Sequence, residues 1–397
     1  MPGSILLTFN PGSSSIKFGL YKIVAGVPQR FGRGEIDLRH QPLTLHVHEG
    51  RQATDVPIAA AMDEDLHGVI DAVLSWLVQH FELSGIAAVG HRVVHGGDRF
   101  VGATRVTADS LAAMAELIPL APLHQPQSVR LMRAILTIRP DLPQVASFDT
   151  AFHRGQTEVI RRFALPRDLY DKGIKRYGFH GLSYCFIARA FASLEPDLGT
   201  KRVIAAHLGS GASLCAMTGG QSRDSSMGFS TLDGVPMATR PGALDAGVIL
   251  HLQQHMGFGV GDIEDLLYHR SGLLGLSGIS ADSRDLVASD RPEARQALAI
   301  FCLRVAREVA AQATSIGGID ALIFTAGIGE HQPSIRAGIA DHLGWLGVRL
   351  DAAANAANAT RISAPDSRVP VFVIATDEEQ VIAEEAVAVL HGPVGPA

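Results

Sequence analysis

The sequence predicts an α/β protein made of two related lobes. Strand-like and helix-like segments recur in both halves of the chain, which is the pattern of an α/β fold. A strand, a turn of small residues and a second strand occupy residues 5–21, and the same unit recurs at residues 203–217. The 397 residues are enough for roughly two or three domains on length alone. A cleft between two such lobes is a common place for a ligand.

The N-terminal half is predicted to form a sheet with several helices. Apolar runs bounded by turn residues indicate strands at 5–9, 16–21, 43–47, 86–94 and 145–148. Apolar residues at helical spacing indicate helices at 63–81, 110–118 and 128–138. A second pattern of the same kind starts near residue 150.

The C-terminal half repeats this alternation. The same signals indicate strands at 203–206, 213–217, 321–324 and 369–374. They indicate helices at 184–194, 243–256, 297–316, 334–343 and 378–390. Glycine-containing turns are expected at 209–211 and 327–329.

Composition and charge exclude several classes of protein. With 47% hydrophobic and 19% charged residues, the chain is not dominantly disordered. A net charge of −6 argues against a protein that coats nucleic acid. No apolar stretch reaches the ~20 residues that span a bilayer, and the N-terminus lacks the basic segment of a signal peptide. Cys185, Cys215 and Cys302 are too few and too scattered for a disulfide framework. We therefore expect a soluble, cytoplasmic protein with no nucleic-acid or membrane partner.

Three glycine-containing turns indicate a polyphosphate site. NPGSSS, HLGSGAS and AGIGE each follow an apolar strand. Glycine lets backbone N–H groups approach an anion closely, and serine adds hydroxyl donors. Any one of these turns alone would more readily be a plain hairpin or a strand-to-helix turn. Three in one chain, two of them at matching positions, favour a nucleotide. The sequence contains neither a Walker motif nor the βαβ context of a dinucleotide-binding motif.

The segment His91 to Gly97 offers two readings. The spacing of His91 and His95 is that of a zinc helix, but Arg92 stands where the glutamate general base would be. The segment is predicted to be a strand, where the two histidines would share a face about 13 Å apart. We favour the other reading, in which Arg92 at a strand end holds a carboxylate or phosphate with its two-pronged guanidinium. A surface ion pair is the plain alternative.

Other polar residues occupy positions that suit a catalytic or ligand-binding role. Asp149 follows a buried strand, at the ligand-facing edge of an α/β sheet, where it could organise a metal or cap a helix. His180 is flanked by glycines and aromatic residues, although a lone histidine is more often structural. Arg240 lies in a proline-containing loop. The stretches 282–284 and 377–379 are expected to be solvent-facing polar turns.

Nine segments, taken in order, resemble the acetate kinase family, also called the acetokinases. They are FNPGSSSIKF, GHRVVHGG, APLHQP, SFDTAFH, RYGFHGLSY, HLGSGAS, DSSMGFSTLDG, TAGIGEH and ATDEE. The resemblance runs from Leu6 to the last helix and places the chain in the superfamily of actin, Hsp70 and sugar kinases. It implies two duplicated ribonuclease H-like lobes with an interdomain cleft. The lobes would be residues 1–150, with the helix at about 380–397 packing back on them, and a nucleotide-binding lobe at 151–379.

The resemblance implies a reversible, ATP-dependent phosphorylation of acetate to acetyl phosphate with Mg²⁺ or Mn²⁺, in a homodimer. Propionate or another short-chain acid is the alternative substrate. A carboxylate is already a nucleophile at pH 7, because its pKa is about 4–5. The harder task is to hold the charge of a loose transition state, so we favour direct in-line transfer. A nucleotide-dependent conformational ATPase of the same superfamily and a zinc hydrolase are the competing classes.

The resemblance also implies a role for individual residues. Asp149, His180, Arg240 and Arg92 match the catalytic residues, with Asp149 more readily organising Mg²⁺ than removing a proton. Arg92, Val94, Leu123 and Phe179 match the residues that bind the acid. Asn10 and Glu378 match the residues associated with magnesium. The residues that match the ATP site are Lys17, His207, Leu208, Gly209, Ser210, Gly211, Asp282, Ser283, Arg284, Gly327, Ile328, Gly329, Glu330 and His331.

Some positions depart from the family pattern. Ser210 and His331 stand where the family commonly has asparagine, and Thr231 replaces a proline near the acyl pocket. Pro11 replaces a small residue, and 241–245 is a variant of the family stretch. None of these changes removes a charged catalytic candidate, so activity is expected, while the preferred acid stays open.

Overall fold

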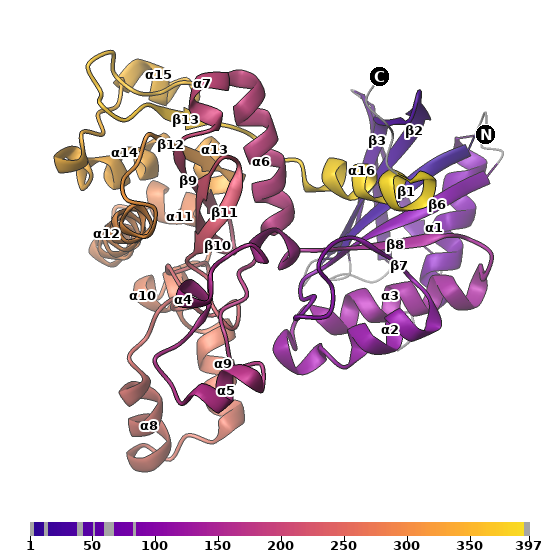
Figure 1. Ribbon diagram of the computed structural model, residues 1–397, viewed down its shortest axis with the longest axis horizontal. Coiled ribbons are helices and arrows are strands. Elements are labelled where there is room, and N and C mark those ends of the chain that lie inside the picture. The colour runs from indigo at the N-terminus through magenta and orange to yellow at the C-terminus, as the bar shows by residue number, and fades with distance from the viewer. Residues whose placement is uncertain are drawn as a thin grey trace. The chain divides into compact units, whose positions relative to one another are not determined.

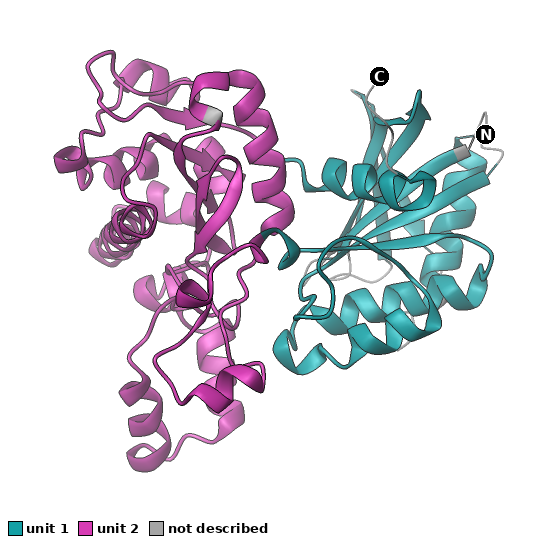
Figure 2. Cartoon of the chain, in the orientation of Figure 1, with its two compact units in different colours: residues 1–152, 377–397 teal, residues 153–376 magenta. Residues whose placement is uncertain are grey.

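The computed structural model describes residues 4–11, 15–37, 43–50, 52–58, 67–81 and 85–392. The chain forms two compact units (Figures 1 and 2). Unit 1 contains residues 1–152 and 377–397, and unit 2 contains residues 153–376. Each unit has one sheet with helices packed against it, so the predicted α/β class is confirmed.

Unit 1 is built on an eight-stranded mixed sheet with the order β5-β4-β3-β2-β1-β6-β8-β7. The strands are β1 (Ser4–Pro11), β2 (Ser15–Val24), β3 (Val27–Asp37), β4 (Leu43–Glu49), β5 (Gln52–Ile58), β6 (Gly85–Val93), β7 (Thr104–Arg105) and β8 (Gln144–Phe148). The helical elements are α1 (His67–His80), α2 (Ala108–Ala115), α3 (Gln125–Ile138), α16 (Glu378–His391) and the 3₁₀ turns η1 (Ile118–Leu120) and η2 (Ala151–His153). Strands β1 to β5 pair antiparallel, whereas β6 runs parallel to β1 and β8 parallel to β6.

Helices cover both faces of the unit 1 sheet. Because side chains alternate across each strand, residues of one strand contribute to the cores on both faces. On one face, Phe9 and Phe18 belong to a core that includes residues of α1 and α3. On the other face, Leu6 and Tyr21 pack with Ala383 and neighbouring residues of α16. Helix α16 thus joins the N-terminal unit although it comes last in the chain (Figure 2).

Unit 2 is built on a five-stranded sheet with the order β11-β10-β9-β12-β13. The strands are β9 (Arg202–Leu208), β10 (Ala212–Thr218), β11 (Gln221–Ser225), β12 (Ala321–Thr325) and β13 (Val371–Val373). The helical elements are α4 (Glu158–Arg161), α5 (Arg167–Asp171), α6 (Gly181–Leu194), α7 (Pro196–Gly199), α8 (Ala246–His255), α9 (Val260–His269), α10 (Gly272–Ser277), α11 (Ser283–Ala288), α12 (Pro292–Ser315), α13 (Ala326–His331), α14 (Pro333–Asp341), α15 (Ala352–Ala356) and the 3₁₀ turn η3 (Gly344–Leu346).

The two units share one strand topology. The series β3-β2-β1-β6-β8 in unit 1 corresponds to β11-β10-β9-β12-β13 in unit 2. In each series the central strand has an antiparallel neighbour on one side and a parallel neighbour on the other. The predicted repeat of strand, turn and strand is therefore confirmed as β1–β2 and β9–β10.

Three local predictions were wrong. The predicted turn at 327–329 belongs to helix α13, whose first residue, Ala326, has a left-handed backbone (φ 64) and donates its N–H to the Glu330 carboxylate at 2.7 Å. The predicted solvent-facing turns at Asp282 and Asp377 are caps of α11 and α16, because each aspartate accepts a backbone N–H of its helix. Residues 12–14 of the first glycine turn and 63–66 of the predicted helix lie outside the described residues.

In the described part of the chain, no helix combines the length and apolar character that a membrane span requires.

Candidate active site

A cluster of charged side chains centres on Arg92 in unit 1. Arg92 lies near the end of β6, and Asp149 follows β8, the parallel neighbour of β6, so both reach the carboxyl edge of the sheet. The guanidinium donates two hydrogen bonds to the Asp149 carboxylate, from Nε at 3.2 Å and from Nη2 at 2.7 Å. Its third nitrogen, Nη1, donates to the Asn10 side-chain oxygen at 3.0 Å. Arg92 is therefore held on two sides.

The first turn of α16 completes this cluster. The Asn10 amide nitrogen donates to Glu378 Oε2 at 3.0 Å and to Glu379 Oε1 at 3.1 Å. Glu378 Oε2 also lies 3.6 Å from Arg92 Nη1. The structure thus brings together four predicted residues, Asn10, Arg92, Asp149 and Glu378. Sequence reasoning missed Glu379, although the motif ATDEE contains it.

Negative charge predominates around Arg92. Burial by itself would lower the pKa of Arg92, but the carboxylates of Asp149, Glu378 and Glu379 outweigh burial and raise that pKa. Three carboxylates around one guanidinium leave an excess of negative charge and several oxygen donors. Mg²⁺ prefers oxygen ligands and takes most of its shell from waters and substrate phosphates, with one or two carboxylates from the protein. The donor set therefore fits Mg²⁺. In the described residues no three His, Cys, Asp or Glu side chains form a metal cage, and Mg²⁺ does not require one.

Three further predicted residues of unit 1 lie near the ends of its elements. Lys17 in β2 is the direct cross-strand partner of Asn10, so the two side chains share a face of the sheet, and Lys17 is exposed. Val94 is buried directly after β6, and Leu123 is half-buried in the loop before α3.

The histidines of the zinc reading have other surroundings. His91 Nε2 lies 2.8 Å from the side-chain oxygen of Gln144, and its ring stacks on Phe9. The His95 ring accepts the backbone N–H of Gly97 at 2.9 Å. Burial lowers the pKa of both histidines to about 4, so both are neutral at physiological pH. Strand β6 ends at Val93, and the prediction that both histidines share one strand face was wrong.

In unit 2, His180 and Arg240 converge on Gly211. A Cβ placed on Gly211 would lie 2.8 Å from Arg240 Nη2 and 3.4 Å from His180 Nε2. The Arg240 guanidinium donates to the backbone carbonyl of Thr231 at 2.8 Å, and no described carboxylate forms an ion pair with it. Burial lowers its pKa to about 10, which leaves it charged at neutral pH. The described residues therefore provide no carboxylate partner for the charge of Arg240.

The two histidines of the site are stacked. The rings of His180 and His207 lie 4.2 Å apart and are nearly parallel. His180 Nδ1 lies 2.8 Å from Ser213 Oγ, and His207 Nδ1 lies 2.8 Å from Ser183 Oγ. Sequence reasoning did not assign these serines, because their pairing depends on how α6 docks on the sheet.

A pocket of about 630 Å³ gathers the three predicted nucleotide segments of unit 2. Its lining includes the predicted residues Gly209, Ser210, Asp282, Ser283, Arg284, Gly327, Ile328 and His331. Sequence reasoning missed four other lining residues, Ala238, Leu273, Ala281 and Gln332. The predicted residues His207, Leu208, Gly211, Gly329 and Glu330 are not part of this lining. The Glu330 carboxylate instead accepts the backbone N–H groups of Ala326 and Thr376.

Phe179, the remaining predicted residue, is buried next to His180 in unit 2. Its carbonyl oxygen lies 2.9 Å from Nε2 of His153. The preceding Gly178 has φ 81, and a Cβ there would meet the His153 ring at 2.5 Å, so this approach requires glycine.

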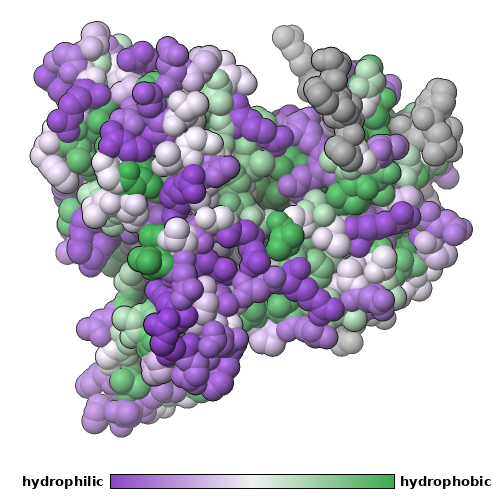
Figure 3. Space-filling model, viewed as in Figure 1, coloured by the Kyte–Doolittle hydropathy of each residue, from purple (hydrophilic) through white to green (hydrophobic). Residues whose placement is uncertain are grey.

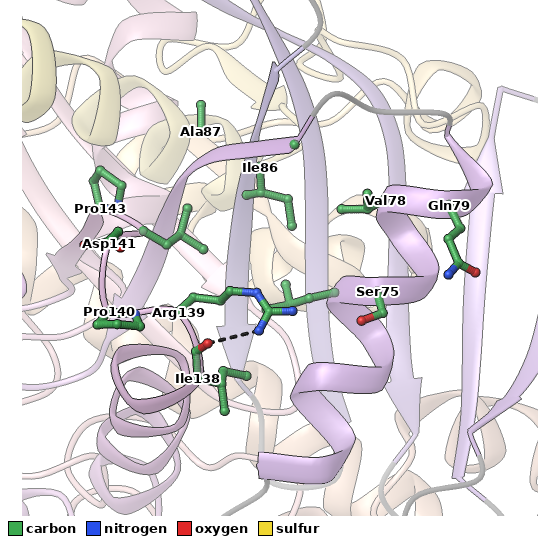
Figure 4. Close-up of a pocket in the computed structure, with 13 residues that line it drawn as sticks. Ser75, Val78, Gln79, Ile86, Ala87, Ile138, Arg139, Pro140, Asp141 and Pro143 are labelled. Atoms are coloured by element: carbon green, nitrogen blue, oxygen red, sulfur yellow. Dashed lines mark hydrogen bonds between the residues drawn. The ribbon is translucent and has the colours of Figure 1, made fainter.

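A second cavity, of about 910 Å³, lies in unit 1 (Figure 4). It is lined by the end of α1, the start of β6 and residues 138–143. Arg139 extends along it, forms an ion pair with Asp71 at 3.0 Å and donates to the carbonyl of Ile138. None of the thirteen lining residues is a predicted site residue.

Known proteins resemble the chain over almost its full length. The model of the acetokinase family matches residues 5–384. An acetate kinase from Methylocella silvestris is 43% identical over 97% of this chain and 98% of its own. A crystal structure of a propionate kinase from Francisella tularensis has a TM-score of 0.89 at 35% identity, covering 96% of this chain and 98% of that one. The Porphyromonas gingivalis acetate kinase gives 0.87 at 32% identity, with 98% and 100% covered. The resemblance inferred from the sequence motifs is confirmed, and the chain belongs to the acetokinase family.

Proposed function

We propose that this protein transfers the γ-phosphoryl group of ATP to acetate, forming acetyl phosphate and ADP in a reversible reaction. The observation that carries the proposal is the convergence of a cation and a histidine on Gly211. Because this residue has no side chain, Arg240 Nη2 and His180 Nε2 both come close to its backbone, and these two nitrogens are suited to hold the oxygens of one phosphoryl group. The pocket formed by the three nucleotide segments lies in the same unit and includes Gly209 and Ser210 of the same turn.

The proposed reaction is a direct displacement. A carboxylate oxygen of acetate attacks the γ-phosphorus, and the bond from that phosphorus to the β–γ bridging oxygen breaks, so ADP leaves with the electron pair. Acetate is ionised at neutral pH and requires no general base. Arg240 and His180 stabilise the charge that spreads over the equatorial phosphoryl oxygens. Arg92, Val94, Leu123 and Phe179 are proposed to bind the acid, and Lys17 to approach the nucleotide phosphates.

Mg²⁺ is proposed to bind through the oxygens of Asn10 and Glu378, with Asp149 organising its waters. When bound, it would neutralise phosphate charge during the transfer. The residues of unit 1 support this ion by their excess of carboxylates, and the ion pair with Arg92 orients the Asp149 carboxylate.

The direct test is formation of an acyl phosphate by the purified full chain. With ATP, Mg²⁺, acetate and hydroxylamine, we expect acetyl hydroxamate and ADP in equal amounts. Adding EDTA in excess over Mg²⁺ should abolish the product, and Mn²⁺ should restore it. ATP hydrolysis without hydroxamate from any short-chain acid would contradict the proposal and favour a conformational ATPase.

Propionate is the second candidate substrate, since one of the similar structures is a propionate kinase. One methylene in an apolar pocket changes discrimination by only about 1–3 kcal/mol. We expect kcat/KM to decrease in the order acetate, propionate, butyrate. An optimum at propionate would change the substrate without changing the reaction class.

A homodimer is proposed because helix α8 of unit 2 has no buried residue. Its exposed apolar side chains, with those just beside it, are Leu244, Val248, Leu250, Met256 and Val260. Apolar residues appear among polar ones over this part of unit 2 (Figure 3). Soluble monomers rarely leave such a helix uncovered. We expect light scattering to give twice the mass of one chain and Leu250→Lys to give the monomer mass. Val159→Lys, at an even more exposed apolar residue elsewhere in unit 2, should leave the dimer intact.

A further inference from the structure

The first turn of α6 and the strand pair β9–β10 are joined by a reciprocal arrangement of histidines and serines. His180 of the helix turn bonds Ser213 of β10, and His207 of β9 bonds Ser183 of the helix. Ser213 and His207 are direct cross-strand partners. The two histidine rings stack on each other between these hydrogen bonds. Each histidine therefore uses Nδ1 for a serine, and Nε2 is the nitrogen that can face a ligand.

The hydroxyl of Tyr184 also contacts Ser213. Tyr184 is fully buried one turn after His180, and its phenol oxygen lies 2.6 Å from Ser213 Oγ. Residues four apart lie on the same side of a helix, which explains why both side chains reach one serine. The backbone of Tyr184 also donates to the carbonyl of His180 at 3.0 Å. We call Tyr184, Ser213 and His180 the relay.

The backbone of His180 adopts an energetically unfavourable conformation. It has φ 57, in the left-handed region that side chains other than glycine rarely adopt. Such a conformation costs on the order of 1–3 kcal/mol and persists only where its surroundings enforce it. The hydrogen bonds of the relay and the stack on His207 supply that enforcement, which indicates that the placement of this ring matters.

The hydrogen positions in the relay follow from donor chemistry. A serine hydroxyl has one hydrogen and can donate to only one of its two partners. A phenol is more acidic than an aliphatic hydroxyl and is the better donor, and a backbone hydrogen bond from His207 also reaches the phenol oxygen. Tyr184 then donates to Ser213, and Ser213 donates to His180 Nδ1. A neutral His180 must therefore carry its hydrogen on Nε2.

Protonation of His180 preserves this result. If the ring gains a second proton, Nδ1–H donates to Ser213, the serine hydroxyl turns toward Tyr184, and Nε2 keeps its hydrogen. The arrangement disfavours only the neutral form with its hydrogen on Nδ1 alone. That form would present a lone pair at Nε2 to a phosphoryl oxygen and repel it.

We propose that Ser213, supported by Tyr184, is a positioning residue that keeps a hydrogen on Nε2 of His180, so that this nitrogen is a constant hydrogen-bond donor next to Gly211. The proposal rests on the proposed function, in which His180 donates to a phosphoryl oxygen. It adds the origin of that donor's tautomer and orientation, which the motif around His180 does not contain.

The first readout is spectroscopic and independent of activity. Nitrogen NMR of ¹⁵N-histidine-labelled full chain distinguishes the two neutral tautomers, and the His180 signals are assigned by their loss in His180→Asn. We expect the Nε2–H form in the wild type and a mixture of tautomers in Ser213→Ala. Ser213→Thr, which keeps a hydroxyl, should restore the Nε2–H form. Ser222→Ala is the matched control, because it removes a buried serine that bonds the Nδ1 of another histidine, His153. It should leave the His180 signals unchanged.

The second readout is kinetic. Ser213→Ala is expected to lower kcat by about 10- to 100-fold, with little change in KM for ATP or acetate, because the lost donor acts in the transition state. Ser213→Thr should recover most of kcat, and Tyr184→Phe should lower it less than Ser213→Ala does. Tyr184→Phe also tests the relay if Ser213→Ala fails to fold.

The outcomes separate the two proposals. If the wild type forms no acyl phosphate but Ser213→Ala changes the tautomer of His180, the proposed function fails and the relay stands. If the wild type is active and neither Ser213→Ala nor Tyr184→Phe changes kcat or the tautomer, the relay is overturned. A loss of thermal stability with an unchanged tautomer and unchanged kcat would make Ser213 merely structural and overturn it equally.

Discussion

Arg240→Ala is expected to lower kcat for acetyl phosphate formation by about a thousandfold, with the protein still folded. In phosphoryl transfer the chemistry is dominated by charge, and a well-placed arginine acts mainly in the transition state. Arg240 suits this role because the hydrogen-bond acceptor found for its guanidinium is a backbone carbonyl and no described carboxylate neutralises it. A second nitrogen of the guanidinium, Nη2, lies next to Gly211.

The same geometry predicts that folding is little affected. The cation is partly buried without a carboxylate partner, so its removal leaves no unpaired charge behind. The midpoint of thermal unfolding should therefore stay close to that of the wild type. Arg240→Lys keeps the charge but not the two-pronged shape, and should lie between wild type and Arg240→Ala.

Two companion variants make the result specific. Gly211→Ala should also reduce kcat, because the new methyl group would lie 2.8 Å from Arg240 Nη2 and displace the guanidinium. Arg349→Ala removes an exposed arginine of the same unit, paired with Asp366 at 2.7 Å, and should leave kcat unchanged. If Arg240→Ala turned over ATP and acetate at the wild-type rate, Arg240 would have no part in the transition state.

The central strands were predictable because they are buried on both faces. The residues of β8 and β12 are all buried, and a continuous apolar run between turn residues is the signal of such a strand. The repeat of strand, turn and strand at β1–β2 and β9–β10 was also predictable from the sequence, since small residues form the turn between the two strands of each pair. Apolar pattern therefore predicted the middle of each sheet.

Strands β3 and β11 and the short helices were not predictable in this way. Strand β3 contains a proline, two glycines and four charged residues, and strand β11 has exposed and partly buried polar residues. Their pairing comes from neighbouring strands, which local pattern does not encode. In α13, two glycines favour a turn by propensity, but the Glu330 carboxylate caps the helix and overrides that preference.

Contacts within the candidate site were even less predictable from local sequence pattern. Asn10 and Glu378 are 368 residues apart in the chain, and no spacing rule predicts the hydrogen bond between them. Family resemblance indicated both residues, but not the partner Glu379 nor the serines that orient His180 and His207. Those contacts depend on strand register and on the docking of α6 and α16. Resemblance names positions, whereas the structure gives the contacts between them.

Arg92→Ala is expected to lower both kcat and stability, unlike Arg240→Ala. Stability should fall because the Asp149 carboxylate is almost fully buried and forms its ion pair with Arg92. Removing one partner of a buried ion pair costs about 3–5 kcal/mol of the free energy of unfolding. We expect kcat to fall by at least about a hundredfold, since a cation of the proposed acid-binding site is lost.

The control is an exposed ion pair of the same unit. Arg139 and Asp71 lie 3.0 Å apart, and both side chains are about half exposed. Arg139→Ala should cost less than about 1 kcal/mol and leave kcat unchanged. Urea unfolding measures the free energy, and the hydroxamate assay measures kcat on the same preparations.

The double variant Arg92→Ala, Asp149→Ala separates stability from catalysis. Removing Asp149 as well eliminates the buried carboxylate that has lost its arginine, so the double variant should regain part of the stability that Arg92→Ala loses. Its kcat should not recover, because it lacks both side chains that are proposed to hold the acid and to organise the metal. A double variant as unstable as Arg92→Ala would show that the pair is not the source of the lost stability. A double variant that recovered kcat would mean that Arg92 serves the reaction only by neutralising Asp149, and would exclude direct contact of Arg92 with the substrate.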